Sequence, residues 1–389
     1  MSRSNRTCLL AVLSVCASTI FTVAQAAPQT DTLSPSNSAP VALVYVSSNP
    51  SSNDYLIQAY TAEANGSLVA TVGQNFSQPL SYLTASSQFL FATDGVNLDS
   101  FSVAQNDGAF TEVDSVNAQA LGGGCGGPIN VFLDRTGSTL YDLDFLGSQC
   151  ANNAYQEFSV TSTGTLDYMG APVASPGFET PLSFLGNNQY GYSATCYHFD
   201  PVVFGYERAS DGSLTELSIV PAMPLGASGQ EYCPSLGATD SANHLAVVMS
   251  PIYDSNWQPA GPNQLGVYTA DASGNLTTTS RHSNMPAVVA GSVNQIVISP
   301  SGKLLAVAGS AGLQVFHFNG ANPITRYTGL LAKDPIAQIF WDNSNHLYAV
   351  SPSAGKLYVF TVTSASAVAA PGSPYLIKNP LGLAVLSER

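Results

Sequence analysis

Two histidines and one glutamate are the side chains in this sequence best suited to acid–base chemistry. His198 lies in TCYHFDP, Glu231 in GQEYCP and His282 in SRHSNMP. An imidazole titrates near neutral pH, so it can take a proton from water and return it to a leaving alkoxide, and a carboxylate can share either step. We therefore predict His198, Glu231 and His282 as catalytic candidates. For each histidine the alternative is a solvated side chain on a loop.

Cysteines lie close to two of these candidates. Two of the six, Cys8 and Cys16, belong to an apolar N-terminal stretch, and the remaining four are Cys125, Cys150, Cys196 and Cys233. Their spacing fits no zinc motif, and an even number in an exported chain favours two disulfides. Four cysteines allow three connectivities, of which we favour Cys125 with Cys150 and Cys196 with Cys233. The second pair would draw His198 and Glu231 towards one neighbourhood. The disulfides could serve only to cross-link long loops, or they could also shape the rim of a pocket, and both roles remain open.

Acidic and aromatic side chains near these positions are expected to contact a substrate. Aromatic rings stack on sugar rings, and carboxylates accept hydrogen bonds from hydroxyl groups. The predicted substrate-binding residues are Asp144, Asp200, Tyr232, Asp254, Trp257 and Asp334. No metal site or other cofactor is predicted. Among metals, calcium is the least implausible, because the loops are rich in oxygen ligands.

The elements that must position these residues repeat along the chain. Seven apolar segments each carry one aromatic residue at the same place, in most cases shortly before a turn that contains glycine. The seven are Tyr60, Phe101, Phe158, Tyr206, Tyr268, Phe316 and Phe360. A strand-turn-strand unit repeated every 40–50 residues or so is typical of a β-propeller. We therefore predict an all-β fold: a seven-bladed propeller with four antiparallel strands per blade, over residues 41–389.

Ring closure follows from the two ends of the repeat region. VALVYVSS, near residue 41, reads as a second strand with no first strand before it, and LGLAVLSE at the C-terminus has the character of a first strand. We expect the C-terminal strand to pair into the first blade, which leaves no open edge. The blades are assigned to 41–76 with 380–387, 79–117, 128–173, 181–221, 234–281, 293–330 and 335–378.

This connectivity sorts the loops onto two faces. The turns between strands one and two and between strands three and four share the bottom face, and the more irregular loops share the top, where a site is expected. His244 and His346 occupy the same slot of a bottom turn, and His317 neighbours a strand-three aromatic, so we assign all three structural or solvent-exposed roles. The top loops hold the candidate residues named above.

Composition limits the partners. The chain opens MSRSNR, continues apolar and reaches Ala24-Gln25-Ala26, which predicts a signal peptide over 1–26 followed by a flexible leader over 27–40. Its removal would leave nine basic against 25 acidic residues. Nucleic-acid binding is therefore not expected, nor is a transmembrane segment. We expect a monomer that is secreted or periplasmic; a lipoprotein anchor at Cys16 is the less favoured alternative.

The blade sequences resemble the lactonase family of seven-bladed propellers, which includes 6-phosphogluconolactonase-like and YVTN-repeat proteins. ISPSGKLLAVAGSAGLQVFHFNG, SNDYLIQAYTAEANGSLVA and LGVYTADASGNL carry the resemblance. It implies lactone hydrolysis by His, Arg and acidic side chains near the mouth of the channel. QPLSYLTAS and TPLSFLGNN lack the basic residues that a phosphorylated sugar acid would need. The resemblance implies a lactone or ester, and the missing basic residues favour a neutral one. We therefore expect a neutral lactone or sugar-derived ester as the small-molecule substrate, hydrolysed at the top of the channel. The alternatives are a non-catalytic extracellular scaffold for glycan or protein partners, and a family fold without activity.

Overall fold

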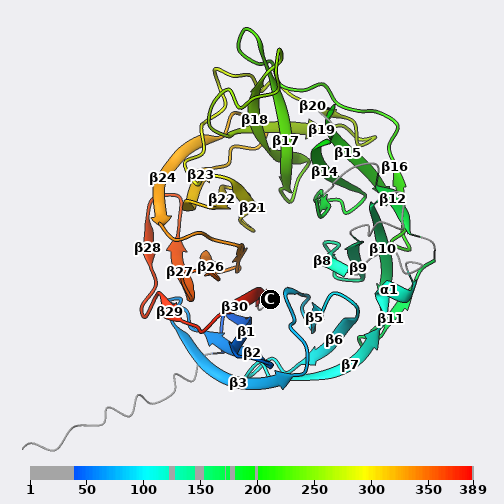
Figure 1. Cartoon of the computed structure of the whole chain (residues 1–389), viewed down its shortest axis with the longest axis vertical. Helices are drawn as coiled ribbons and strands as arrows, with labels where there is room; N and C mark the ends of the chain where they lie inside the picture. Colours follow the sequence, from blue (N-terminus) through cyan, green and yellow to red (C-terminus); the bar gives the residue numbers. More distant parts are fainter. Residues whose placement is uncertain are drawn as a thin grey trace, which may run out of the picture. The chain divides into compact units, whose positions relative to one another are not determined.

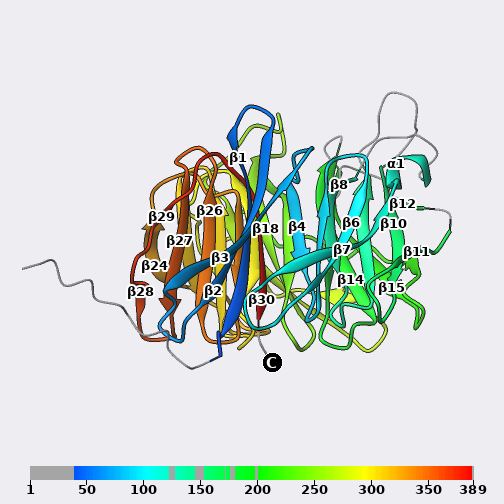
Figure 2. The same cartoon turned by 90° about the horizontal axis from the view of Figure 1, so that it is seen from below.

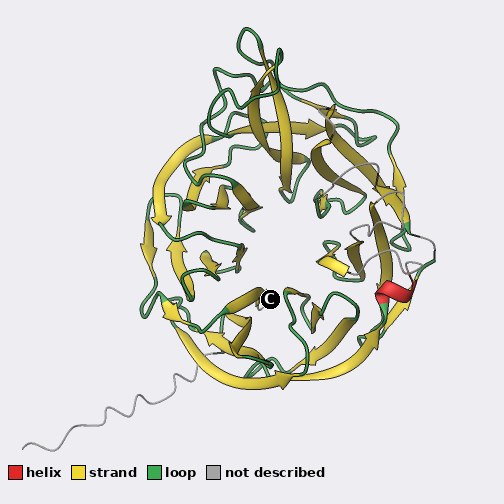
Figure 3. Cartoon of the chain, viewed as in Figure 1, coloured by secondary structure: helices red, strands yellow, loops and turns green. Residues whose placement is uncertain are grey.

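Seven β-sheets surround one axis in the computed structural model, which describes residues 39–121, 128–144, 153–170, 172–175, 180–197 and 200–387 (Figure 1). Each sheet has an unbroken path of four antiparallel strands, and Figure 3 shows one short helix among them. The predicted seven-bladed propeller is confirmed. The predicted signal peptide and nearly all of the leader lie outside the described residues.

The strands of the first four blades follow, each blade from its innermost strand outward. Blade 1 is β30 (Pro380–Ser387), β1 (Ala42–Ser51), β2 (Asp54–Ala62) and β3 (Leu68–Phe76). Blade 2 is β4 (Tyr82–Ala85), β5 (Phe89–Thr93), β6 (Leu98–Val103) and β7 (Phe110–Val116), followed by α1 (Ala118–Leu121). Blade 3 is β8 (Pro128–Leu133), β9 (Thr139–Asp144), β10 (Asn153–Val160) and β11 (Leu166–Tyr168), with β12 (Val173–Ser175) also paired to β10. Blade 4 is β13 (Ser183–Phe184), β14 (Tyr190–Tyr197), β15 (Asp200–Arg208) and β16 (Leu214–Glu216).

Three blades complete the ring. Blade 5 is β17 (Gln230–Thr239), β18 (His244–Tyr253), β19 (Gln264–Ala270) and β20 (Leu276–Thr277). Blade 6 is β21 (Val293–Ile298), β22 (Leu304–Gly309), β23 (Gly312–His317) and β24 (Thr325–Ala332). Blade 7 is β25 (Gln338–Trp341), β26 (His346–Ser351), β27 (Lys356–Val362) and β28 (Ala367–Ala369), with β29 (Tyr375–Leu376) also paired to β27. Seen from the side in Figure 2, the sheets stand upright next to one another around the ring.

The two ends of the propeller meet in blade 1, as the sequence predicted. β30 pairs antiparallel with β1, and Val44 lies opposite Val385. Ala42 to Val46 are completely buried because β1 is sandwiched between neighbouring blades. The ring is therefore closed by hydrogen bonds between the first and last strands.

The strand-three aromatics fill the space between the sheets. Six of the seven are buried, with exposed fractions of 0–5%, and Tyr60 is half-buried. A second recurrent contact joins neighbouring blades at the bottom face, where a strand-two tyrosine donates a hydrogen bond to a turn glycine one blade on. These pairs are Tyr45 to Gly108 (3.1 Å), Tyr141 to Gly212 (2.6 Å) and Tyr192 to Gly274 (2.6 Å). The three glycines have φ of 72°, 107° and 77°, which the strand three-to-four turn requires.

Side chains also link the innermost strands around the channel. Gln295 Oε1 accepts a hydrogen bond from the Ile339 N–H at 2.6 Å, and Gln338 Oε1 accepts one from the Leu383 N–H at 2.7 Å. The two glutamines occupy equivalent places in VNQI and IAQI, one blade apart. Each bond passes from one blade to the next, so polar side chains as well as apolar packing hold the ring.

The three histidines kept apart from the site contact neighbouring side chains. His244 Nδ1 lies 2.7 Å from Asp240 Oδ2, and His346 Nδ1 lies 2.7 Å from Asp342 Oδ2. Both pairs sit in bottom turns, where each aspartate also accepts the backbone N–H of its histidine. The ring of His317 packs against that of Tyr327, with the two ring centroids 4.3 Å apart.

Candidate functional site

Five of the predicted site residues can be placed only in part or not at all. His198, Cys125 and Cys150 lie outside the described residues, so a first disulfide and the role of His198 stay predictions. Asp144 ends β9 and Asp200 begins β15, and only their backbone positions are described. Asp200 therefore belongs to a strand rather than to a long loop. The pairing of β14 with β15 explains the difference, because it continues up to Tyr197 opposite Asp200.

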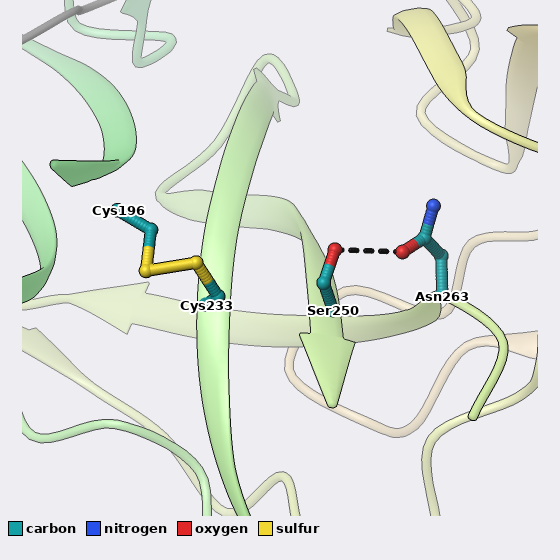
Figure 4. Close-up of a disulfide and its surroundings, with 4 residues drawn as sticks. All are labelled: Cys196, Cys233, Ser250 and Asn263. Atoms are coloured by element: carbon teal, nitrogen blue, oxygen red, sulfur yellow. Dashed lines mark hydrogen bonds between the residues drawn. A yellow bond between two sulfur atoms is a disulfide. The ribbon is translucent and has the colours of Figure 1, made fainter. Parts of the chain in front are cut away.

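The second disulfide is confirmed. Cys196 and Cys233 are bonded, with their Cα atoms 5.2 Å apart, and they join β14 of blade 4 to β17 of blade 5 (Figure 4). On the other side of β17, Ser250 Oγ donates a hydrogen bond to Asn263 Oδ1 at 2.7 Å. Blade 5 is thus tied to blade 4 covalently.

Glu231, Tyr232 and Cys233 lie on β17, which begins at Gln230, four residues before the predicted start of blade 5. The register of β17 against β18 shifts between Pro234 and Gly237, which marks a bulge. A proline is tolerated there because the innermost strand has one unpaired edge. The sequence interpretation began the blade at that proline and so placed the preceding strand residues on a loop.

The hydroxyl of Tyr232 connects the strands of blade 5 to His282. Tyr232 is only 1% exposed, and its O–H donates to Gln264 Oε1 at 2.6 Å. The same oxygen lies 3.2 Å from His282 Nδ1. Because the phenol proton is given to Gln264, the Tyr232 oxygen must accept from His282, and so Nδ1 carries a proton. In the neutral imidazole this leaves Nε2 as the basic nitrogen.

Burial keeps Tyr232 a hydrogen-bond donor over a wide pH range. Desolvation raises the pKa of Tyr232 to about 12, so the phenol stays protonated and continues to donate. Gln264 Nε2 donates to the backbone carbonyls of Met285 (2.9 Å) and His282 (3.3 Å). The His282 N–H donates to the Leu225 carbonyl at 2.9 Å. His282 is therefore exposed but held at its ring and at both backbone groups.

The remaining candidates of blade 5 are on the surface around this cluster. Glu231 is exposed, and its carboxylate makes no hydrogen bond within the described part of the chain. Asp254 is exposed and its N–H donates to the Gly229 carbonyl at 3.3 Å, so it lies near the start of β17. Trp257, in the loop after β18, is half-buried and has a φ of 59°. In Figure 1 the ends of β17 and β18 project beyond the ring with this loop.

Asp334 does not join the cluster. It precedes blade 7 and accepts hydrogen bonds from Lys356 Nζ, at 2.7 Å, and from the Tyr358 hydroxyl. These hydrogen bonds lower the pKa of the Asp334 carboxyl. Blade 6 lies between Asp334 and the residues of blade 5, so the structure separates it from His282.

Sequence reasoning missed Gln264, which orients both Tyr232 and the loop of His282. Nothing in NQLGVYTA marks this residue, since its role depends on strand pairing that brings residues 32 positions apart into contact. Within the described ranges, no three His, Cys, Asp or Glu side chains gather in a way that could hold a metal ion. The expectation of no cofactor, with calcium as the least implausible metal, stays untested. No helix among the described residues is long and apolar enough to cross a membrane.

Solved structures share this architecture at low sequence identity. PpgL, a periplasmic gluconolactonase of Pseudomonas aeruginosa, aligns with a TM-score of 0.65 and 15% identity over 89% of this chain and 99% of its own. Candidate 6-phosphogluconolactonases of Bacteroides uniformis and Bacteroides fragilis both align with a TM-score of 0.64, at 14% and 12% identity, over 88% and 90% of this chain and 99% of theirs. The chain has the fold of these lactonase-type propellers. The resemblance expected from the blade sequences is thus confirmed for the fold, which by itself names no substrate. No family model and no curated protein sequence matches the chain.

Proposed function

We propose that this protein is an exported lactonase-like hydrolase that uses His282 as its general base. The observation that carries the proposal is the Tyr232–His282 contact, since a buried phenol fixes one nitrogen of an exposed imidazole and leaves the other free. The fold shared with a periplasmic gluconolactonase supports the reaction class. The disulfide fits a secreted or periplasmic location.

The chemistry follows from that free nitrogen. Nε2 of His282 takes a proton from water as the water oxygen attacks the carbonyl carbon of a lactone or ester. The resulting imidazolium then returns the proton to the leaving alkoxide as the acyl–oxygen bond breaks, which yields a hydroxy acid. Tyr232 and Gln264 act as positioning residues. Glu231 and His198 stay proposed partners, Glu231 for its exposed carboxylate and His198 for its place two residues after the disulfide-bonded Cys196.

The substrate we propose is a neutral lactone or sugar-derived ester, and a pH-stat screen over a panel of such compounds tests it. His282→Ala should lower kcat/KM at least about 100-fold, because general acid–base catalysis typically contributes that much. The matched control is His317→Ala, which removes a histidine of blade 6. Equal turnover by wild type and His282→Ala would contradict the assignment of His282.

A binding scaffold is the second candidate function, favoured by the loop that follows β18. Tyr253, the last residue of β18, is 44% exposed, and the loop that follows it projects from blade 5. Exposed aromatics of this kind bind glycans or protein partners. Retention on a glycan array, abolished by Tyr253→Ala and unaccompanied by turnover, would favour the scaffold over the hydrolase.

A further inference from the structure

The fourth strand of blade 5, β20, is only two residues long. After Thr277 the chain no longer pairs through its backbone with β19. Instead Thr278 Oγ1 donates to the Val267 carbonyl at 2.5 Å, and Ser280 Oγ accepts the Val267 N–H at 2.9 Å. Side-chain hydroxyls thus replace the backbone ladder between β19 and the segment from 278 to 280.

A second segment, from the connection between blades 4 and 5, lies against this one. The Tyr268 hydroxyl donates to the Ala222 carbonyl at 3.2 Å, and Leu225 forms a parallel bridge with Arg281. The hydrogen bond from the His282 N–H to the Leu225 carbonyl continues this pairing. Two extended segments are therefore held side by side over the core of blade 5.

A groove of about 430 Å³ is formed by these segments, a volume in the range of small-molecule sites. Its lining comprises Ala222, Met223, Leu225 and the residues from Leu276 to Arg281. Leu276 is buried and Met223 packs on the same core cluster, whereas Leu225 is 75% exposed. Ile219 and Val220, on the same connection, are 58% and 56% exposed. One wall of the groove is thus apolar and accessible to a ligand.

The polar end of the groove is formed by Arg281. Its guanidinium makes no hydrogen bond or ion pair with the described part of the chain, although its backbone N–H donates to Asn284. Arg208, by contrast, pairs with Asp134 at 3.0 Å, and Arg135 donates to three backbone carbonyls. Thr279 adds a hydroxyl that is likewise without a partner among the described residues. A free arginine in a chain of net charge −14 is a specific local attraction for an anion.

We propose that this groove binds a small amphipathic carboxylate, with its hydrocarbon chain on Met223, Leu225 and Leu276 and its carboxylate on Arg281. Guanidinium and carboxylate match in two parallel hydrogen bonds, and the hydrocarbon chain loses contact with water on the apolar wall. The proposal rests on the groove alone and stands whether or not His282 is catalytic. A released hydroxy acid would belong to the same ligand class only if it carried a hydrocarbon chain.

Calorimetric titration with octanoate tests the proposal, with 1-octanol and acetate as probes that retain only the chain or only the headgroup. We expect saturable binding of octanoate, with a dissociation constant raised about tenfold by Arg281→Gln and about fivefold by Leu225→Ser. Arg326→Gln is the matched control, since Arg326 is an exposed arginine of blade 6 that is also free of partners in the described chain. Equal affinity for 1-octanol, no saturable heat with octanoate, or equal weakening by Arg326→Gln would overturn the proposal.

Methyl-labelled methionine locates the ligand independently of affinity. The Met223 methyl resonance should shift on titration with octanoate, while that of Met169 in blade 3 should not. A shift confined to methionines other than Met223 would place octanoate elsewhere and would also overturn the proposal. Loss of lactonase activity would not bear on this result, so failure of the proposed function and failure of the groove remain distinguishable.

Discussion

A single hydroxyl group, that of Tyr232, determines which nitrogen of His282 carries its proton. Neutral histidine in water favours the Nε2–H tautomer, whereas the contact with Tyr232 requires Nδ1–H. Nitrogen-15 NMR of the imidazole should therefore show the Nδ1–H form in the wild type and a return to Nε2–H in Tyr232→Phe. His317 provides an internal control, because its ring lies against Tyr327 in blade 6 and should be unaffected. An Nε2–H tautomer in the wild type would contradict the hydrogen-bond assignment, and no turnover assay is needed.

Glu157 gives the fold a pH dependence of its own. Burial raises its pKa to about 7, although its Oε1 accepts the Leu214 N–H at 2.7 Å, a hydrogen bond that favours the charged form. Between the unfolded value near 4.5 and about 7, the folded state binds more protons than the unfolded state, so stability falls as pH rises. Glu157→Gln keeps an acceptor for Leu214 and removes the charge. We expect it to raise the free energy of unfolding by up to about 2 kcal/mol at pH 8 and to leave it nearly unchanged at pH 4.

Urea unfolding at the two pH values measures this difference. Glu216→Gln is the control, since Glu216 is an exposed glutamate of β16 in the neighbouring blade. A stabilisation of the same size at pH 4 and pH 8 would show that the carboxylate charge is not its cause.

At the scale of elements, the disulfide links strands from two blades across a sequence separation of 37 residues. Closing a loop of this length in the unfolded chain stabilises the fold by roughly 3–4 kcal/mol in the chain-entropy model. The double variant Cys196→Ser, Cys233→Ser should lose about that much free energy of unfolding in urea. Ser250→Ala is a useful comparison, because it breaks the hydrogen bond to Asn263 on the other side of β17 and leaves the disulfide intact. A double variant as stable as the wild type would mean that the cross-link does not constrain the unfolded chain.

The elements also show which parts of the structure could be predicted from the sequence. Strand-three aromatics and turn glycines recur because every blade packs on its neighbours in the same way, so Tyr268 and Phe316 could be assigned to equivalent strands from their contexts alone. The pairing of Cys196 with Cys233 followed from that repeat. The Tyr232–Gln264–His282 contact and the groove could not be predicted, since both exist only where blade 5 departs from the repeat. The early start of β17 at Gln230 is such an exception, and a repeat pattern contains no information about exceptions.

At the scale of the whole molecule, β30 stabilises the ring because its two faces serve different blades. Leu383 and Val385 pack in a cluster with Tyr348 and Leu357 of blade 7. Ala384 and Leu386 pack in another cluster, with residues of blade 2. Alternate side chains of one strand therefore join the blades on either side of blade 1, and each large buried aliphatic side chain contributes about 1.5–3 kcal/mol.

A chain that ends at Asn379 should consequently lose far more stability than a terminal deletion of equal length in a loop. It exposes the edge of β1, leaves Gln338 Oε1 without the Leu383 N–H, and opens both clusters. We expect a lower midpoint of thermal unfolding and concentration-dependent association through the free edge. Adding a peptide of residues 380–389 should restore the midpoint. A peptide with Leu383 and Ala384 exchanged and Val385 and Leu386 exchanged has the same composition but directs its large side chains differently, so it should rescue less. The truncated chain could instead have the same midpoint of thermal unfolding as the full-length protein, or both peptides could restore the midpoint equally. Either result would mean that ring closure by β30 does not stabilise the propeller.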